Sequence, residues 1–207
     1  MKDVDRYRSG LMEIKRRMRV IDQIGKGELN IIYPATSVET AALQFRKVVE
    51  LIAFSSLIAH KELYSETYEK FATHWNARLI LQDLERINPN FYPEPILQVP
   101  SKREGIMHDL VERPNDYLTK AQLISLYEEC GGLMHAENPY GKKIDYDAFA
   151  AKTKNWRNRI VNLLNTHVVR LVDENQFWLF QMGTDKIPPS YTLFGRVVDD
   201  KEAPATL

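Results

Sequence analysis

The stretch TSVETAALQFRKVVELIAFSSLI, residues 36–58, sets the expectation for the fold. Thr36 and Glu39 match a capping box, so the pattern predicts a helix from residue 36 to about residue 62. Apolar residues lie nearly all round this helix: Val38, Ala41, Ala42, Leu43, Phe45, Val48, Val49, Leu51, Ile52, Phe54, Leu57 and Ile58. A helix that is apolar on most sides must be covered by other elements, so the stretch predicts the centre of a helical bundle.

Four other segments carry apolar residues at helical spacing, and we expect helices over about residues 4–24, 66–87, 119–138 and 146–166. The third begins with a capping box of Thr119 and Gln122 and ends at Asn138-Pro139. The first has a basic face: Arg6, Lys15, Arg16, Arg17 and Arg19. The simpler interpretation of that face is a solvated surface, and the alternative is a phosphate-binding patch.

Towards the C-terminus the apolar period changes from that of a helix to that of a strand. The runs VVRLV, QFWLFQM and YTLFGRVV are separated by turn-forming residues and predict three antiparallel strands. The predicted fold class is therefore mainly α: a bundle of about five helices over 1–166, with a small C-terminal antiparallel β-meander over 167–198. We expect 199–207 to be a disordered tail. Within a proline-rich insertion at 88–118, ILQV and IMHDLV can form a short hairpin.

Composition excludes several classes of protein. The 28 basic residues balance 28 acidic ones, so no overall field attracts nucleic acid or a membrane. The single cysteine, Cys130, excludes an internal disulfide, and the five histidines show no metal-ligand spacing. No phosphate-binding glycine loop is present, so we expect neither a metal nor a cofactor. The first residues lack the apolar core of a signal peptide and no run is long enough to span a membrane, which predicts a cytoplasmic protein.

The stretch EECGGLMHAENP, residues 128–139, is unusual inside a predicted helix, because each glycine costs about 1 kcal/mol relative to alanine. Helical numbering places four of its residues on one stripe: Glu128, Gly131, His135 and Asn138. The glycines either let another backbone approach while His135 caps a carbonyl, or they leave space for a ligand that His135 touches. On the first interpretation Gly131 and Gly132 lie at a homodimer interface.

Arg46 and Glu50 are two charges one turn apart on the most apolar helix. Neither can be buried unpaired without a penalty of several kcal/mol. They form either a self-sufficient structural bridge or a polar site between helices, with His135 as a third member. A small-molecule enzyme site built from these three residues is a further alternative.

The helix containing ALQFRKVVELIAF, followed by LYEECGGLMHAENP, resembles the HEPN superfamily (higher eukaryotes and prokaryotes nucleotide-binding domain) over about residues 36–166. The resemblance implies a helical bundle that dimerises, with His135, Arg46 and Glu50 as catalytic residues and Glu128 and Asn138 as binding residues. In active members four to six residues separate an arginine from the histidine that follows it, and the dimer joins two such motifs into one metal-independent RNA-cleaving site.

This chain departs from that pattern, because the residues at those positions before His135 are Glu128, Glu129 and Cys130. Arg46 would have to act in place of the missing arginine. We therefore expect a HEPN-like cytoplasmic protein linked to an RNA or nucleotide stress response or to phage defence. Whether it is an enzyme, as a metal-independent ribonuclease, is left open by the sequence. The alternative is a non-catalytic HEPN-like module for dimerisation or partner binding. The partners expected are a second copy of the chain, RNA or a nucleotide, and a protein encoded nearby, but no membrane.

Overall fold

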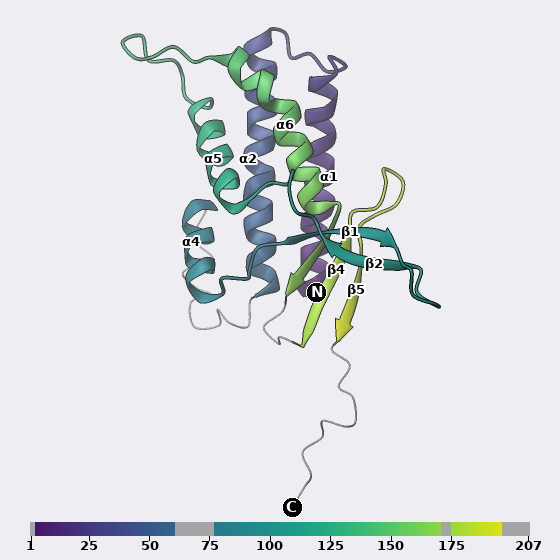
Figure 1. The fold of residues 1–207 in the computed structure, drawn as a ribbon. Coiled ribbons are helices and arrows are strands. Elements are labelled where there is room, and N and C mark those ends of the chain that lie inside the picture. Colours follow the sequence, from purple (N-terminus) through teal and green to yellow (C-terminus); the bar gives the residue numbers. More distant parts are fainter. Residues whose placement is uncertain (1–2, 61–76, 171–174, 196–207) are drawn as a thin grey trace, which may run out of the picture.

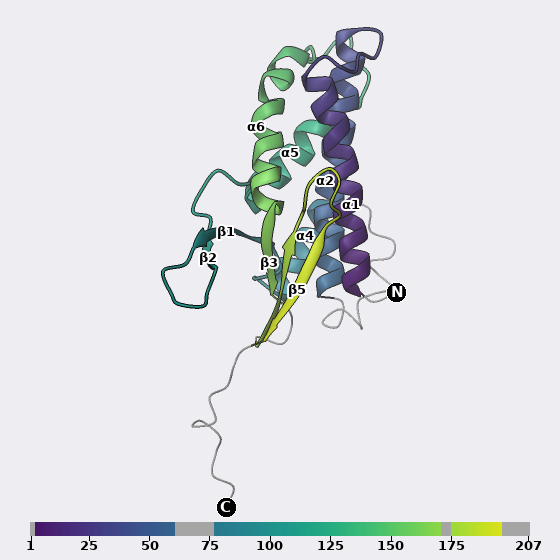
Figure 2. The ribbon, with the colours of Figure 1, turned by 90° about the vertical axis from the view of Figure 1, so that its right-hand side faces the viewer.

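The computed structural model describes residues 3–60, 77–170 and 175–195 of the 207-residue chain. Within these ranges the helices are α1 (Asp3–Gly25), α2 (Pro34–Ala59), α4 (Ala77–Ile87), α5 (Lys120–Gly132) and α6 (Tyr146–Leu164). The strands are β1 (Glu94–Pro100), β2 (His108–Glu112), β3 (Thr166–Arg170), β4 (Gln176–Gln181) and β5 (Ser190–Gly195). The helices run side by side with α2 among them, and the sheet lies towards one end, beside α1 and α6 (Figures 1 and 2).

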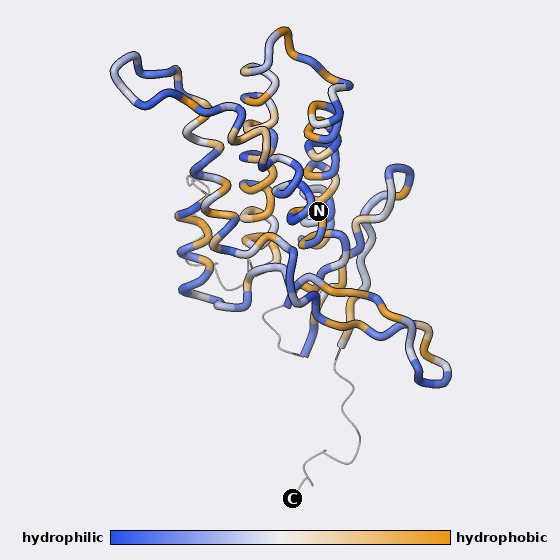
Figure 3. The backbone as a smooth tube through the Cα atoms, turned by 45° about the horizontal axis from the view of Figure 1, so that its top comes forward, coloured by the Kyte–Doolittle hydropathy of each residue, from blue (hydrophilic) through white to orange (hydrophobic). Residues whose placement is uncertain are grey.

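The pairing of α1 with α2 is the longest helix contact, and the sequence explains it. The buried residues of α1 recur at spacings of three and four: Val4, Tyr7, Leu11, Ile14, Met18 and Ile21. Gly10 allows a close approach, because a Cβ atom there would stand 2.7 Å from Oγ of Ser55 on α2. Hydrophobic and hydrophilic residues alternate in short runs along the helices (Figure 3), as expected when one face of each helix enters the core.

All five strands belong to one antiparallel sheet in the order β2-β1-β3-β4-β5. The hairpin predicted within 88–118 is confirmed as β1 and β2, with Leu97 opposite Val111. β1 also pairs with β3, where Pro95 lies opposite His167. The prediction of a mainly α bundle with a small C-terminal meander is therefore wrong: the chain is an α+β protein whose sheet joins two distant segments. Local periodicity indicates each strand, but it carries no information about pairing between segments so far apart in the sequence.

The sheet packs on α1 through aromatic side chains. Tyr7 of α1 stacks on Phe180 of β4, with 4.3 Å between ring centres. Trp178 meets the same tyrosine edge-on at 6.4 Å. Because Tyr7 and Phe180 are almost completely buried, this contact is part of the main core rather than an attachment to it.

Two predicted helix ends are wrong. α2 begins at Pro34, with Tyr33 as its N-cap. Thr36 is not a capping residue, because its hydroxyl donates to the carbonyls of Ile31 and Tyr33. In α5 the capping box of Thr119 and Gln122 is confirmed, but the helix ends at Gly132 rather than at Asn138. The low helix propensity of glycine outweighs the apolar residues that continue the period beyond it.

Several expectations fall partly or wholly outside the described residues. They are the end of the helix predicted to about residue 62, the first part of the helix predicted over 66–87, residues 171–172 and 196–198 of the predicted strands, and the tail at 199–207. Among the described residues, no helix is both long enough and apolar enough to cross a membrane.

Candidate functional site

Arg46 and Glu50 form an ion pair within α2, with 3.4 Å between Nε and Oε1. The guanidinium also donates from Nη2 to the hydroxyl of Tyr127 on α5 at 2.6 Å. Its central carbon lies 4.0 Å from the centre of the Tyr127 ring, so the cation stacks on that ring. Lys47 adds a second ion pair to Glu50 at 3.1 Å. The pair thus joins α2 to α5. Glu50 balances the charge of Arg46, the Tyr127 hydroxyl accepts one of its N–H groups, and the Tyr127 ring covers one face of the guanidinium.

The two glycines have different surroundings. A Cβ atom at Gly131 would stand 2.8 Å from Nη1 of Arg46, so this glycine leaves room for the guanidinium. At Gly132 an added Cβ meets no atom within 4 Å. Within the chain it is therefore a side chain, not another backbone, that occupies the space beside Gly131. Gly132 is exposed at the end of α5.

His135 lies beyond the end of α5, in an open groove of about 560 Å³. The groove is lined by Glu39, Thr40, Leu43, residues 133–137 and Tyr146. The Tyr146 hydroxyl donates to Oε1 of Glu39 at 2.8 Å, and this hydrogen bond raises the pKa of Tyr146. Neither Arg46 nor Glu50 is among the described residues that line the groove. His135 instead shares it with two carboxylates, Glu39 and Glu137.

The predicted stripe is divided because α5 ends before His135. Glu128 points across to α4 and pairs with Arg78 at 2.8 Å. Asn138 shapes the following loop: its Oδ1 accepts from the backbone N–H of Tyr140 at 3.0 Å. The structure thus brings Arg46, Glu50 and Gly131 together, and it places Glu128, His135 and Asn138 in other surroundings.

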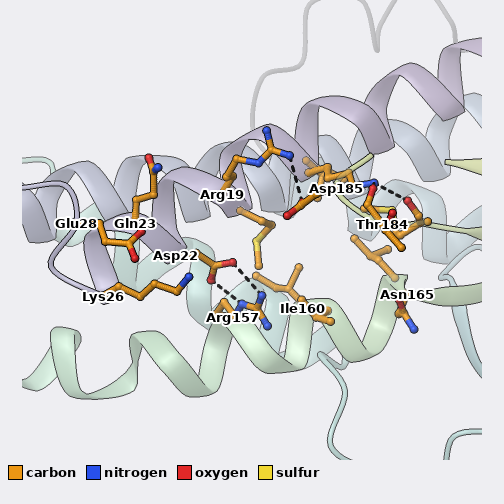
Figure 4. Close-up of a pocket in the computed structure, with 17 residues that line it drawn as sticks. Arg19, Asp22, Gln23, Lys26, Glu28, Arg157, Ile160, Asn165, Thr184 and Asp185 are labelled. Carbon is orange, nitrogen blue, oxygen red and sulfur yellow. Dashed lines mark hydrogen bonds and ion pairs between the residues drawn. The ribbon is translucent and has the colours of Figure 1, made fainter. Parts of the chain in front are cut away.

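A second pocket, of about 460 Å³, lies between α1, α6 and the β4–β5 loop (Figure 4). Asp22 of α1 and Arg157 of α6 meet there through two hydrogen bonds, of 2.7 Å from Nε and 2.9 Å from Nη2. This bidentate contact raises the pKa of Arg157. Lys26 and Glu28 also line the pocket, near the end of α1 and just beyond it.

The β4–β5 loop forms one wall of this pocket and is held by cations of α1. Nζ of Lys15 donates to the carbonyls of Met182 at 2.9 Å and Ile187 at 2.8 Å, and also to that of Thr184. Gly183 has a φ of 67°, and a Cβ atom there would stand 2.5 Å from the Ile187 carbonyl oxygen. The shape of the wall therefore depends on a glycine at this position.

The sequence contained only part of the signal for this pocket. The basic face of the first predicted helix includes Lys15 and Arg19, which both line it. Arg157 comes from a helix far along the chain. Asp22 lies between Arg19 and Lys26 in the sequence, so it did not stand out as a site residue. The spacing of Asp22 from Arg19 indicates at most an ion pair within one helix, so no local pattern pointed to Arg157.

Two buried residues, His167 and Cys130, have structural rather than chemical roles. Nδ1 of His167 lies 2.9 Å from the carbonyl oxygen of Leu164, so it carries the proton, and Nε2 accepts from the Tyr7 hydroxyl at 2.9 Å. Burial lowers the pKa of His167 to about 4, so it is neutral near pH 7. Burial raises the pKa of the Cys130 thiol to about 12, which makes it a poor nucleophile.

Among the described residues, no cluster of three or more His, Cys, Asp or Glu side chains could hold a metal ion. Comparison of the chain with protein-family models, with curated protein sequences and with solved structures finds no match. The fold defines an α+β protein, and the resemblance to the HEPN superfamily stays a prediction.

Proposed function

We propose that this chain is a HEPN-like protein of the cytoplasm that serves an RNA- or nucleotide-linked stress response or phage defence by binding a partner rather than by cleaving RNA. The partner proposed first is a second copy of the chain. The observation that carries the proposal is the environment of Arg46, the arginine named above as a substitute for the missing one.

Arg46 is already engaged on several sides. Its Nε faces Glu50, its Nη2 donates to Tyr127, and the Tyr127 ring covers one face of the guanidinium. Stabilising a phosphorane-like transition state requires donors that are already directed at the developing charge. Arg46 would first have to leave a carboxylate and an aromatic ring, and this favours a structural role.

The groove around His135 also favours binding of a protein over binding of a phosphate. Glu39 and Glu137 line it and repel an approaching phosphate. Leu43 and Met134 line the same groove and are 41% and 38% exposed. Exposed apolar side chains next to polar groups are typical of protein interfaces. Gly132, which is open to its surroundings, extends this surface at the end of α5.

A metal-independent ribonuclease is the second candidate, and one observation favours it. His135 is exposed in an open groove, where a substrate can reach its imidazole. In a dimer, the second copy could supply the missing arginine. The two candidates therefore differ in whether the pure protein cleaves RNA and whether His135 is needed.

Cleavage is tested by incubating the pure full-length chain with total RNA in the presence of a metal chelator, beside His135→Ala and Arg46→Lys. We expect intact RNA in all three samples. Cleavage by the parent that is lost in His135→Ala would overturn the binding proposal and establish the ribonuclease.

Dimerisation is tested by size-exclusion chromatography with light scattering at tens of micromolar. We expect a dimer for the parent and a monomer for Gly132→Arg, because the new side chain would occupy the proposed contact. Gly25→Arg is the matched control, since an added Cβ there also meets no atom within 4 Å. A monomeric parent, or a dimer that Gly132→Arg leaves unchanged, would contradict this choice of partner and surface.

A further inference from the structure

We propose that the pocket between α1, α6 and the β4–β5 loop binds a small organic anion, which carries one phosphate or carboxylate group on an apolar body. The site is separate from the Arg46 cluster and from the His135 groove. It does not depend on the function proposed above.

The first argument is the size and construction of the pocket. Its volume of about 460 Å³ lies within the range of small-molecule sites. The side chains come from three elements that are distant in the sequence (Figure 4). Lys15 and Arg19 hold the loop wall in place, through three carbonyls and through Asp185 at 3.2 Å. Because the wall is already fixed, a ligand would not have to order it.

The second argument is the apolar side of the pocket. Met18, Ile160 and Met182 line it from α1, α6 and the end of β4. Methionine side chains adapt to ligands of different outline and make favourable contacts with aromatic rings. An apolar body of one ring or a short chain therefore has suitable neighbours here.

The third argument is the charge at the polar side. Arg157 uses two of its five N–H groups on Asp22 and a third on Oδ1 of Asn158 at 3.4 Å, so two donors remain for another anion. Figure 4 shows the Lys26 side chain extended towards the Asp22–Arg157 pair. In the part of the chain that the structure describes, Nζ of Lys26 has no ion-pair partner. Figure 4 shows the Asp22 carboxylate between these two cations, and Arg157 already neutralises it. An anionic head group beside this pair that reaches both Lys26 and the remaining donors of Arg157 would receive charge-assisted hydrogen bonds from both.

Glu28 provides a second test, in which a substitution should strengthen the binding of an anion. It is an exposed residue on the rim of the same pocket, and its carboxylate repels an incoming anion. An anion site therefore makes two opposite predictions for two neighbouring exposed residues. Removing the charge of Lys26 weakens binding, and removing the charge of Glu28 strengthens it.

The experiment is isothermal titration of the full-length chain with four single-ring compounds: phenyl phosphate, benzoate, benzyl alcohol and benzylamine. We expect millimolar binding of at least one of the two anions, and the stronger one identifies the head group. Lys26→Met should weaken that binding about tenfold or more, which corresponds to the loss of one charge-assisted hydrogen bond. Glu28→Gln should tighten it by about two- to fivefold.

The matched control is Lys154→Met, which removes an exposed lysine of α6 that does not line the pocket and should leave binding unchanged. Thermal melts of all three variants verify that they remain folded. The proposal is overturned if neither anion binds at millimolar concentration or if Lys26→Met binds as the parent does. It is also overturned if benzylamine or benzyl alcohol binds as tightly as the anions.

Discussion

The α2–α5 contact and the α1–α6 contact each hold an arginine against a carboxylate. Of the two pockets described above, one adjoins the second pair and neither is lined by the first. At the first contact the Tyr127 ring lies against Arg46. The space that a side chain at residue 131 would occupy is filled by the guanidinium of Arg46. At the second, Asp22 and Arg157 meet beside a space of about 460 Å³. A partly buried charged pair is thus weak evidence for a functional site, and what occupies the space around it decides between structure and function.

The largest expected effect is that of acid on the α1 side of the molecule, where His167 lies. Its pKa is about 4 in the folded state against 6.5 in the unfolded chain, so the folded state binds fewer protons between these values. Stability is therefore complete above pH 6.5 and falls as the pH drops, by up to ~1.4 kcal/mol per pH unit and about 3 kcal/mol in total.

Denaturant unfolding at neutral pH and near pH 4 measures this loss. The dependence of stability on pH should be smaller in His167→Leu than in the parent, because the buried imidazole is then absent from both states. His60, whose pKa burial also lowers, adds to the effect in the same direction. Equal pH dependence in the parent and in His167→Leu would contradict the assignment to His167.

The second effect concerns the filled contact. Glu50→Ala leaves Arg46 partly buried without its carboxylate, and we expect the free energy of unfolding to fall by about 2–3 kcal/mol. This is less than for a fully buried pair, because the Arg46 side chain is 27% exposed and keeps Tyr127 as a partner. Glu85→Ala removes the exposed partner of Lys120 and should change stability by less than about 0.5 kcal/mol. Equal losses in the two variants would place Arg46 in a solvated bridge.

The third effect separates the two glycines. Gly131→Ala places a methyl group against Nη1 of Arg46 and should destabilise by about 1 kcal/mol, although alanine favours the helix. Gly132→Ala has open space and should range from neutral to about 1 kcal/mol more stable. Thermal melts of both variants measure the difference. If both variants gain stability equally, Arg46 does not need the space beside Gly131.

The smallest effect is expected for His135→Ala. The side chain is exposed in the groove, so its loss should change the free energy of unfolding by less than about 0.5 kcal/mol. A denaturant melt of the variant beside the parent is sufficient to measure this. A large loss of stability would instead show that the imidazole caps a neighbouring group.

Short-range patterns in the sequence predicted several elements correctly. The apolar spacing of α1, the capping box of Thr119 and Gln122, and the hairpin within 88–118 are confirmed, because each depends on neighbouring residues. The join of β1 to β3 and the end of α5 at Gly132 were missed. The first is a long-range pairing, and at the second apolar Leu133 and Met134 continued the helical period beyond the last turn.

The candidate site was predictable to the same extent. The pairing of Arg46 with Glu50 follows from their spacing on one helix, whereas Tyr127 as the third member does not. The stripe that included His135 required α5 to continue beyond residue 135, but the helix ends at Gly132. Asp22 and Arg157 come together only through the packing of α1 against α6, which no local pattern encodes.

Methionine side chains provide the most direct test of the claim that the α1–α6 pocket binds an organic anion and the groove at the end of α5 does not. Met18 and Met182 line the α1–α6 pocket, and Met134 lines the groove at the end of α5. The measurement is an NMR titration of carbon-13 methyl-methionine protein with phenyl phosphate, with resonances assigned by single Met→Leu variants. The account predicts that the resonances of Met18 and Met182 shift while that of Met134 stays in place. A shift of Met134 with Met18 and Met182 unmoved would contradict it.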